Sequence, residues 1–338
     1  MPWIVSSTLS AITLVGLLIF SYPVSAQEKM RVGLSSVSAT NGSIWVAEEK
    51  GLFKKYGIDT EVIVIGGGGA RVVSSLLAGE VQFSVGGGDG SLRAQLRGAD
   101  VVIIASTLTK GLQRWMTRPS IKSWQELKGT KVAITRFGSA GHLALQLMLR
   151  KWHLSPGDVN ILQLGSSPAM LASLEKGGTD GAILTMPTFF LAEDKGFRVV
   201  GDPVNMDIYY LQNTLESSRG YLRKHRDQAL RFLKGYTEGI AYFKKNKRES
   251  LEIMRKKLRI QSEQERDIRY LELSYQLLAT SYYNDVPYPS LKGIETVLEF
   301  IAADDPKARG ADPKSFTDDS LVREIEASGL IKRHHEKP

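Results

Sequence analysis

The stretch that decides the fold is residues 31–65, RVGLSSVSATNGSIWVAEEKGLFKKYGIDTEVIVI. It begins with a short apolar run, RVGL, and continues through a polar loop from Ser35 to Ser43. A helical segment ending in EEKGLFKKYG follows, and then a second strand pattern, TEVIVI. Strand, helix and strand in this order are typical of an α/β fold with largely parallel strands.

The same alternation continues to residue 201 in two similar runs, one before Thr107 and one from Lys131 to Gly201. Helical patterns cover residues 70–78, 91–97, 140–152 and 168–176. Continuous or alternating apolar runs predict strands. These runs cover residues 30–34, 60–65, 83–85, 101–106, 131–135, 160–163, 181–184 and 198–201.

From Ser218 onward the pattern is almost entirely helical. An amphipathic stripe marks the first long helix, and further helices are expected over residues 262–278, 291–302 and 318–328. Residues 304–315 are rich in Pro, Gly and charge and predict a loop. The stripe consists of Leu230, Leu233, Tyr236, Ile240 and Phe243.

The amino-terminal residues predict an export signal. The apolar run from Leu9 to Phe20 is short for a membrane span, and small residues follow it in YPVSA, which ends at Ala26. We therefore expect cleavage after Ala26 and a periplasmic protein; the alternative is a retained membrane anchor. The chain has no cysteine, which excludes disulfides, thiol catalysis and thiolate metal sites.

Length and charge narrow the possibilities further. A chain of 338 residues, less the signal, predicts two domains that each bury a core. Part of the net charge of +8 lies in residues 244–259, KKNKRESLEIMRKKLR. Such a run could bind nucleic acid or an anionic membrane, but Leu251, Ile253, Met254 and Leu258 give it an apolar side. A solvated helix face is the preferred interpretation, and no nucleic-acid partner is expected.

Several segments resemble a known family. AEEKGLFKKYGIDTEVIVI (47–65) and SSLLAGEVQFSVGG (74–87) resemble the amino-terminal signature of periplasmic solute-binding proteins of ABC transporters. The group concerned is the sulfonate, nitrate, taurine and thiamine-precursor group, also called NMT1-like or THI5-like. SWQELKGTKVAITRFGSAGHLAL (123–145) resembles the start of its second lobe, and residues 221–254 resemble its helical return.

The resemblance implies an α/β, two-lobed periplasmic binding protein fold of type II. Each lobe would hold a mainly parallel sheet flanked by helices, and two crossing hinge strands, near 106–109 and 206–212, would join the lobes. The first lobe would be discontinuous, with the helical carboxyl-terminal region packing onto it. The expected boundaries are a signal peptide over 1–26, lobe 1 over 27–107, lobe 2 over 108–208, and the return to lobe 1 over 209–338.

Gly- and Ser-rich loops follow the predicted strands and precede helix starts. Examples are Gly66–Gly69, residues 86–90 and residues 137–141. In open α/β sheets, ligands bind beyond the carboxyl ends of strands, where such loops and helix amides converge. The glycine runs lack the GxxxxGK[ST] and GxGxxG spacings, so they do not indicate a nucleotide site. Tight turns are the alternative role of these glycines, as helix capping is for Ser38, Thr40 and Asn41.

Two charged residues in these loops suggest the kind of ligand. Arg136, between a strand and a helix start, could pair with a carboxylate or sulfonate, although a surface salt bridge is the commoner role. Asp89 could accept from a cationic group or cap the next helix. Together they would suit an anionic or zwitterionic solute. The candidate ligand-binding residues are Ser38, Thr40, Asn41, Gly67, Gly68, Asp89, Thr107, Arg136, Gly138, Ser139, Ala140 and Met186.

The sequence gives weak signals for catalysis. HExxH and GxSxG motifs are absent, and no close carboxylate pair lies on a candidate loop. We therefore expect a monomeric, non-enzymatic receptor without cofactor or metal, which closes on a small molecule and delivers it to an inner-membrane permease with a cytoplasmic ATPase. The alternatives are a periplasmic sensor subunit and a THI5-like pyrimidine synthase. Those synthases are cytosolic and carry a cysteine-containing motif that this chain lacks.

Overall fold

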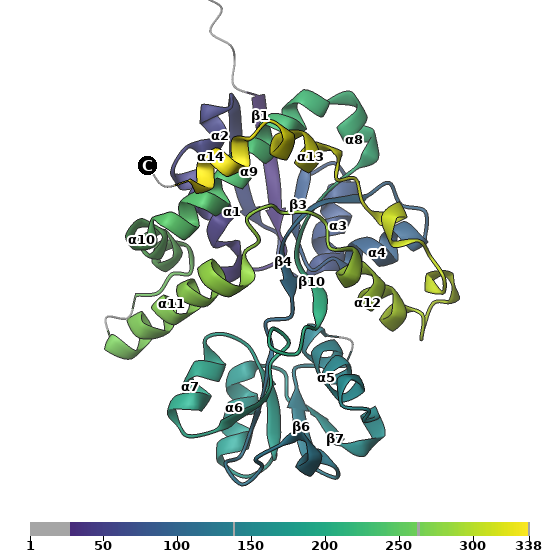
Figure 1. The fold of residues 1–338 in the computed structure, drawn as a ribbon, viewed down its shortest axis with the longest axis vertical. Helices are drawn as coiled ribbons and strands as arrows, with labels where there is room; N and C mark the ends of the chain where they lie inside the picture. Colours follow the sequence, from purple (N-terminus) through teal and green to yellow (C-terminus); the bar gives the residue numbers. More distant parts are fainter. Residues whose placement is uncertain (1–27, 138, 262–263, 337–338) are drawn as a thin grey trace, which may run out of the picture.

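The computed structural model describes residues 28–137, 139–261 and 264–336. The predicted signal peptide, residues 1–26, and Gly138 lie outside the described residues. Figure 1 shows two lobes, each with a sheet flanked by helices, joined by a narrow waist. The predicted two-lobed α/β fold is therefore confirmed.

The sheet of lobe 1 has five strands in the order β2-β1-β3-β10-β4. The first three are parallel to one another, whereas β10 is antiparallel to both of its neighbours. Strand β10 follows lobe 2 in the chain and lies between β3 and β4, so the sheet of lobe 1 is completed by a segment that comes after lobe 2. The strands are β1 (Glu28–Leu34), β2 (Ile58–Val64), β3 (Phe83–Gly86), β4 (Val102–Lys110) and β10 (Tyr209–Ser217).

The sheet of lobe 2 repeats this plan in the order β7-β6-β8-β5-β9. Its one reversed strand, β5, pairs antiparallel with β8 and β9. The sequence pattern did not predict β5, whose sequence is RWMT. The strands are β5 (Arg114–Thr117), β6 (Lys131–Ile134), β7 (Asn160–Gln163), β8 (Gly181–Leu184) and β9 (Arg198–Gly201).

Two short segments connect the lobes. The outgoing one is residues 111–113, between β4 and β5, and the returning one is residues 202–208, between β9 and β10. Lys110, the last residue of β4, pairs with Tyr209, the first residue of β10, so the two connecting segments leave the first sheet side by side. The crossings were predicted near 106–109 and 206–212. Residues 106–109 and 209–212 are strand residues of the first sheet, whereas residues 206–208 lie in the returning segment.

Most helices cover the sheet of lobe 1, including the whole carboxyl-terminal region (Figure 1). Its aromatic core is centred on Phe232, whose ring stacks on Phe53 and Phe83 with centroids 4.9 and 4.4 Å apart. The helices of lobe 2 are α5 (Ala140–Lys151), α6 (Ser167–Glu175) and α7 (Thr188–Asp194). Those of lobe 1 are α1 (Gly42–Glu49), α2 (Leu52–Lys55), α3 (Gly69–Leu77), α4 (Asp89–Leu96), α8 (Arg219–Lys224), α9 (Arg226–Lys245), α10 (Lys247–Lys257), α11 (Glu265–Leu277), α12 (Leu291–Ile301), α13 (Ser320–Ala327) and α14 (Leu330–His335).

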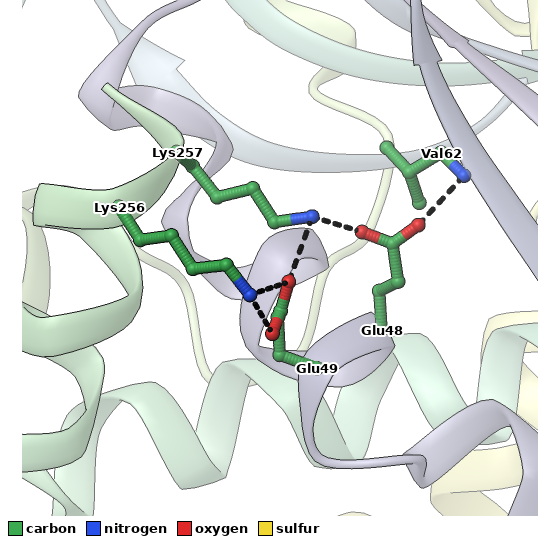
Figure 2. Close-up of polar contacts among 5 residues, drawn as sticks. All are labelled: Glu48, Glu49, Val62, Lys256 and Lys257. Carbon is green, nitrogen blue, oxygen red and sulfur yellow. Dashed lines mark hydrogen bonds and ion pairs between the residues drawn. The ribbon is translucent and has the colours of Figure 1, made fainter. Parts of the chain in front are cut away.

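The basic run 244–259 contains α10, and its lysines form ion pairs (Figure 2). Lys257 Nζ lies 2.5 Å from Glu48 and 3.1 Å from Glu49, and Lys256 Nζ lies 2.9 Å from Glu49. The other carboxylate oxygen of Glu48 accepts from the Val62 backbone N–H at 2.9 Å, which ties the helices to the edge strand β2. A helix with an apolar side and a solvated polar face was predicted here. The part of the polar face that carries Lys256 and Lys257 is instead paired with α1.

A buried carboxyl lies in the middle of the first sheet. Glu216, on β10, is fully buried, and its carboxyl lies 2.6 Å from Ser84 Oγ and 2.5 Å from Thr214 Oγ1. Thr214 Oγ1 also lies 3.0 Å from the Gly86 carbonyl oxygen. The hydroxyls of Ser84 and Thr214 both donate to the carboxyl, so it has hydrogen-bond partners inside the sheet. Burial raises the pKa of Glu216 to about 8, although these two donors act to lower it.

Replacing Glu216 with Gln should therefore change the pH dependence of stability. The pKa of Glu216 in the folded protein, about 8, lies above the usual value of 4.5. The contribution of its neutral carboxyl to stability is therefore fully present below pH 4.5 and is lost as the pH rises through about 8. Relative to wild type, Glu216→Gln should gain about 3 kcal/mol in free energy of unfolding between pH 5 and pH 8. Urea denaturation at both pH values measures this, and equal differences at the two would contradict a neutral buried carboxyl.

Candidate functional site

A polar pocket of about 270 Å³ lies between the lobes. Lobe 1 contributes the loops after β1 and β3, the start of α3 and the first part of β10. Lobe 2 contributes the loop between β6 and α5. The pocket brings together eight of the predicted residues: Ser38, Thr40, Asn41, Gly68, Asp89, Arg136, Ser139 and Ala140.

Four helices begin at the polar pocket. These are α1, α3 and α4 of lobe 1 and α5 of lobe 2, whose first residues or capping residues line it. The first N–H groups of a helix have no partner within the helix, and its dipole is positive at that end. Four such ends around one small cavity therefore favour a negatively charged group.

Close contact between α3 and α4 explains two of the glycines. A Cβ on Gly69 would lie 2.4 Å from the Gly87 carbonyl oxygen, and one on Gly90 would lie 2.5 Å from the Ala70 nitrogen. Both distances are too short for a side chain, so only glycine lets the two helix starts approach this closely. The Gly-rich loops thus gather helix ends at the pocket.

Hydroxyl and amide side chains at the pocket also hold its loops. Ser38 Oγ accepts from the Thr40 backbone N–H at 3.3 Å, and Ser139 Oγ accepts from the His142 N–H at 3.3 Å. Asn41 Nδ2 donates to the Ser36 carbonyl oxygen at 2.9 Å. Of the three residues for which capping was the alternative role, Ser38 caps the short turn Ala39–Asn41, whereas Asn41 makes no side-chain capping bond to α1.

Two opposite charges face each other across the pocket. The exposed Arg136 guanidinium makes no hydrogen bond or ion pair within the described part of the chain. Burial raises the pKa of Asp89, while the Gly90 N–H and the charges of Arg93 and Arg136 oppose the rise. Arg136 is therefore close enough to Asp89 to influence its ionisation, yet it remains available for an anion.

The floor of the cleft comes from residues that the sequence analysis did not select. Tyr210, Gln212 and Asn213 of β10 line the polar pocket, and Asn213 Nδ2 donates to the Thr40 carbonyl oxygen at 2.7 Å. The amide oxygens of Gln212 and Asn213 are buried without a hydrogen-bond partner in the described residues. Buried polar groups normally have partners, so these two indicate a site. The polar pair within the strand YYLQNTLES was the available signal.

An apolar chamber of about 610 Å³ adjoins the polar pocket. Ser36, Ser38, Thr40 and Gln212 line both cavities, so the two adjoin along these residues. Met186, a predicted ligand contact, lines the chamber rather than the pocket. Of the described residues that line the chamber, only Asp267 is charged; its apolar lining includes Val37, Leu112, Met186, Pro187, Leu258, Ile260 and Leu271.

Two predicted residues, Gly67 and Thr107, line neither cavity. Gly67 forms a turn with φ of 74°. Thr107, on β4, is fully buried, and its Oγ1 lies 3.4 Å from the carbonyl oxygen of Asn213 on β10. Gly138 is outside the described residues.

Helix α11 of the carboxyl-terminal region bridges to lobe 2. Arg269 donates to both carboxylate oxygens of Asp194 on α7, at 2.8 and 3.1 Å, and Tyr270 Oη donates to the same carboxylate at 2.7 Å. The Tyr270 ring is buried and stacks on Phe190 with centroids 6.1 Å apart. The lobes are thus held together on one side of the chamber by contacts beyond the waist.

The described residues offer little other chemistry. They hold no group of three or more His, Cys, Asp or Glu side chains suited to a metal ion. In the same residues, no helix has the length and hydrophobicity to cross a membrane. His142 lies against Phe137 and Phe300, where burial lowers the pKa of its imidazole, and no histidine of the described chain lines either cavity.

Solved structures share this architecture. The periplasmic aliphatic sulphonate binding protein SsuA from Escherichia coli aligns with a TM-score of 0.71 at 18% identity, over 88% of this chain and 99% of that one. The desulfurization enzyme DSZB aligns with a TM-score of 0.62 at 15% identity, over 91% of this chain and 99% of that one. The fold is therefore that of the two-lobed periplasmic binding proteins.

The sequence comparisons define the family. Residues 40–250 match the family described as NMT1/THI5 like, and the chain belongs to it. The putative binding protein YtlA of Bacillus subtilis is 26% identical over 61% of this chain, and the taurine-binding periplasmic protein of Escherichia coli is 30% identical over 38%. The matched regions span 63% and 40% of the lengths of these two relatives.

Removing the α7–α11 bridge should let the lobes separate. We expect the double variant Arg269→Ala, Tyr270→Phe to show longer and more widely distributed interlobe distances without ligand, because all three hydrogen bonds from these side chains to Asp194 are lost. Spin labels on Lys122→Cys and Lys224→Cys report the distance by double electron–electron resonance, since the chain has no native cysteine.

The matched control for that measurement is Arg266→Ala, which removes an arginine whose ion pair stays within α11. Its distance distribution should equal that of the wild type. An unchanged distribution in the double variant would show that the bridge does not limit separation of the lobes.

Proposed function

We propose that the protein is the periplasmic substrate-binding component of an ABC importer and that it captures a small organic anion or zwitterion in the interlobe cleft. The main support is the polar pocket, where the Arg136 guanidinium and four helix N-termini surround one cavity. A guanidinium fits the oxygens of a carboxylate or sulfonate in bidentate fashion, and helix ends add to the attraction.

The family relationships favour a sulfonate as the anionic group. One relative is named as taurine-binding, and a protein of the same fold is named as binding aliphatic sulphonates. Asp89 adds an acceptor that a simple anion does not need, and it lies in the same pocket as Arg136. A solute that carries both an acidic group and an amino group therefore suits the pair.

The mechanism we propose is closure of the two lobes on the ligand. Residues of both lobes line the polar pocket, so a bound solute contacts both only when they approach each other. The closed form would dock on an inner-membrane permease after export of the mature protein. Of the ligand contacts predicted from the sequence, we propose that the main ones are Arg136, Asp89, Ser38, Thr40 and Ser139, which line the polar pocket.

The two charges should have separable effects on binding. Arg136→Ala should weaken both ethanesulfonate and taurine by about 1.5–3 kcal/mol, because each loses a charge-assisted hydrogen bond. Asp89→Asn should weaken taurine alone, because ethanesulfonate has no ammonium group. Isothermal titration calorimetry measures both.

Arg97→Ala is the control for this experiment, since Arg97 is exposed and lines neither cavity. It should bind both solutes as the wild type does. Unchanged affinity in Arg136→Ala would remove that residue from the site, and equal losses of both solutes in Asp89→Asn would argue against an ammonium contact.

The same fold also serves an enzyme, DSZB, so catalysis needs a direct test. We expect a sulfonate that binds to be recovered chemically unaltered after prolonged incubation with the purified protein, as judged by mass spectrometry. A heat-denatured sample gives the background. Turnover above that background would show that the protein is an enzyme and would contradict the receptor function.

A further inference from the structure

The loop of residues 36–41 is a wall of both cavities of the cleft. Ser36, Ser38 and Thr40 line the polar pocket and the apolar chamber alike. Two of its hydrogen bonds are local, because Asn41 Nδ2 donates to the Ser36 carbonyl oxygen and the Asn41 backbone N–H donates to the Ser38 carbonyl oxygen. Such bonds shape the loop, but they do not place it relative to the sheets, since both partners belong to the loop.

Helix α1, which follows this loop, begins without a capping side chain of its own. Its N-cap residue, Asn41, makes no side-chain hydrogen bond to the helix. The first N–H groups of a helix need acceptors from outside the helix. The Ser43 N–H finds such an acceptor 240 positions away in the sequence, because it donates to Tyr283 Oη at 3.2 Å.

The same hydroxyl also binds the loop. Tyr283 Oη donates to the Thr40 carbonyl oxygen at 2.9 Å, and Asn213 Nδ2 donates to that oxygen at 2.7 Å. A hydroxyl has one hydrogen and two lone pairs, so Tyr283 can donate to Thr40 while it accepts from Ser43. Burial raises the pKa of Tyr283 to about 12, so the proton stays on the oxygen at neutral pH. Among the described residues, Asn213 and Tyr283 are the only distant side chains that form hydrogen bonds with residues 36–43.

Tyr283 is itself fixed by packing and by the edge of the first sheet. It is 4% exposed, and its ring meets that of Phe243 edge to face, with centroids 5.0 Å apart. A Cβ on Gly42 would lie 2.4 Å from the same Phe243 ring, so the start of α1 packs closely on this aromatic residue. The backbone N–H of Asn284 donates to the Thr107 carbonyl oxygen of β4 at 3.1 Å. The Tyr283 hydroxyl therefore has a defined position relative to the sheet.

We propose that Tyr283 is a positioning residue of the ligand site, whose hydroxyl holds the loop that carries Ser38 and Thr40 in the form that binds the solute. This inference rests on the proposed receptor function and adds to it a residue that lines neither cavity. A loop that is fixed before binding does not have to be ordered by the ligand, so binding loses less entropy. The carboxyl-terminal region thereby sets the affinity of a pocket wall formed by the early part of the chain.

The test compares two variants that each remove one buried tyrosine hydroxyl. Tyr283→Phe keeps the ring and loses both bonds to the loop and α1. Tyr275→Phe is the matched control, because Tyr275 also packs on Phe243, with centroids 4.8 Å apart, and its hydroxyl donates to the Phe243 carbonyl oxygen at 2.8 Å. We expect Tyr283→Phe to bind taurine about five- to tenfold more weakly than the wild type in isothermal titration calorimetry. Tyr275→Phe should bind taurine as the wild type does.

Hydrogen exchange without ligand gives a second readout that does not depend on the receptor function. In Tyr283→Phe the Ser43 amide should exchange at least about tenfold faster than in the wild type, as measured by nuclear magnetic resonance, and in Tyr275→Phe it should not. Unchanged exchange in Tyr283→Phe, or faster exchange with unchanged taurine affinity, would overturn the positioning role.

Equal losses of taurine affinity in the two variants would assign the effect to the general stability of the core and would also overturn the proposal. If the wild type binds neither taurine nor ethanesulfonate, the proposed receptor function for sulfonates fails. The exchange rate of the Ser43 amide then still decides whether Tyr283 holds the loop.

Discussion

The structure depends on one strand arrangement, the insertion of β10 between β3 and β4. The chain returns from lobe 2 and pairs antiparallel with both strands, so the first sheet is complete only after the second lobe has been made. The same strand carries Tyr210, Gln212 and Asn213 at the floor of the cleft. It also places Glu216 in the centre of the sheet, where hydroxyl groups of Ser84 and Thr214 satisfy a neutral carboxyl.

The electrostatics of the cleft follow from that arrangement. Strands of both lobes end at the waist, and the helices that follow them begin there. Partial positive charges at four helix starts and the guanidinium of Arg136 favour an anion in the polar pocket, and the carboxyl of Asp89 lies beside them as an acceptor. A pocket of this kind selects charge first, whereas the identity of the solute depends on the shape beyond the head group.

The carboxyl-terminal helices have a second part in the cleft besides covering lobe 1. Lys256 and Lys257 fix helix α10 to Glu48 and Glu49 of α1, and Glu48 also accepts from the Val62 N–H of β2 (Figure 2). That anchored helix leads through Leu258 and Ile260 to α11, which contacts lobe 2. The basic run that suggested a polyanion partner thus supports a wall of the proposed ligand site.

The sequence by itself determined the α/β alternation, the helical return and the loops that bear Arg136, Asp89 and Ser38. These signals are local, because apolar periodicity and capping residues act within a few positions of the chain. It did not reveal β5 or the inward position of Thr107. Only the tertiary structure decided that Gln212 lies at the cleft floor and that α11 meets lobe 2, because each contact joins segments far apart in the chain and depends on how the lobes are placed.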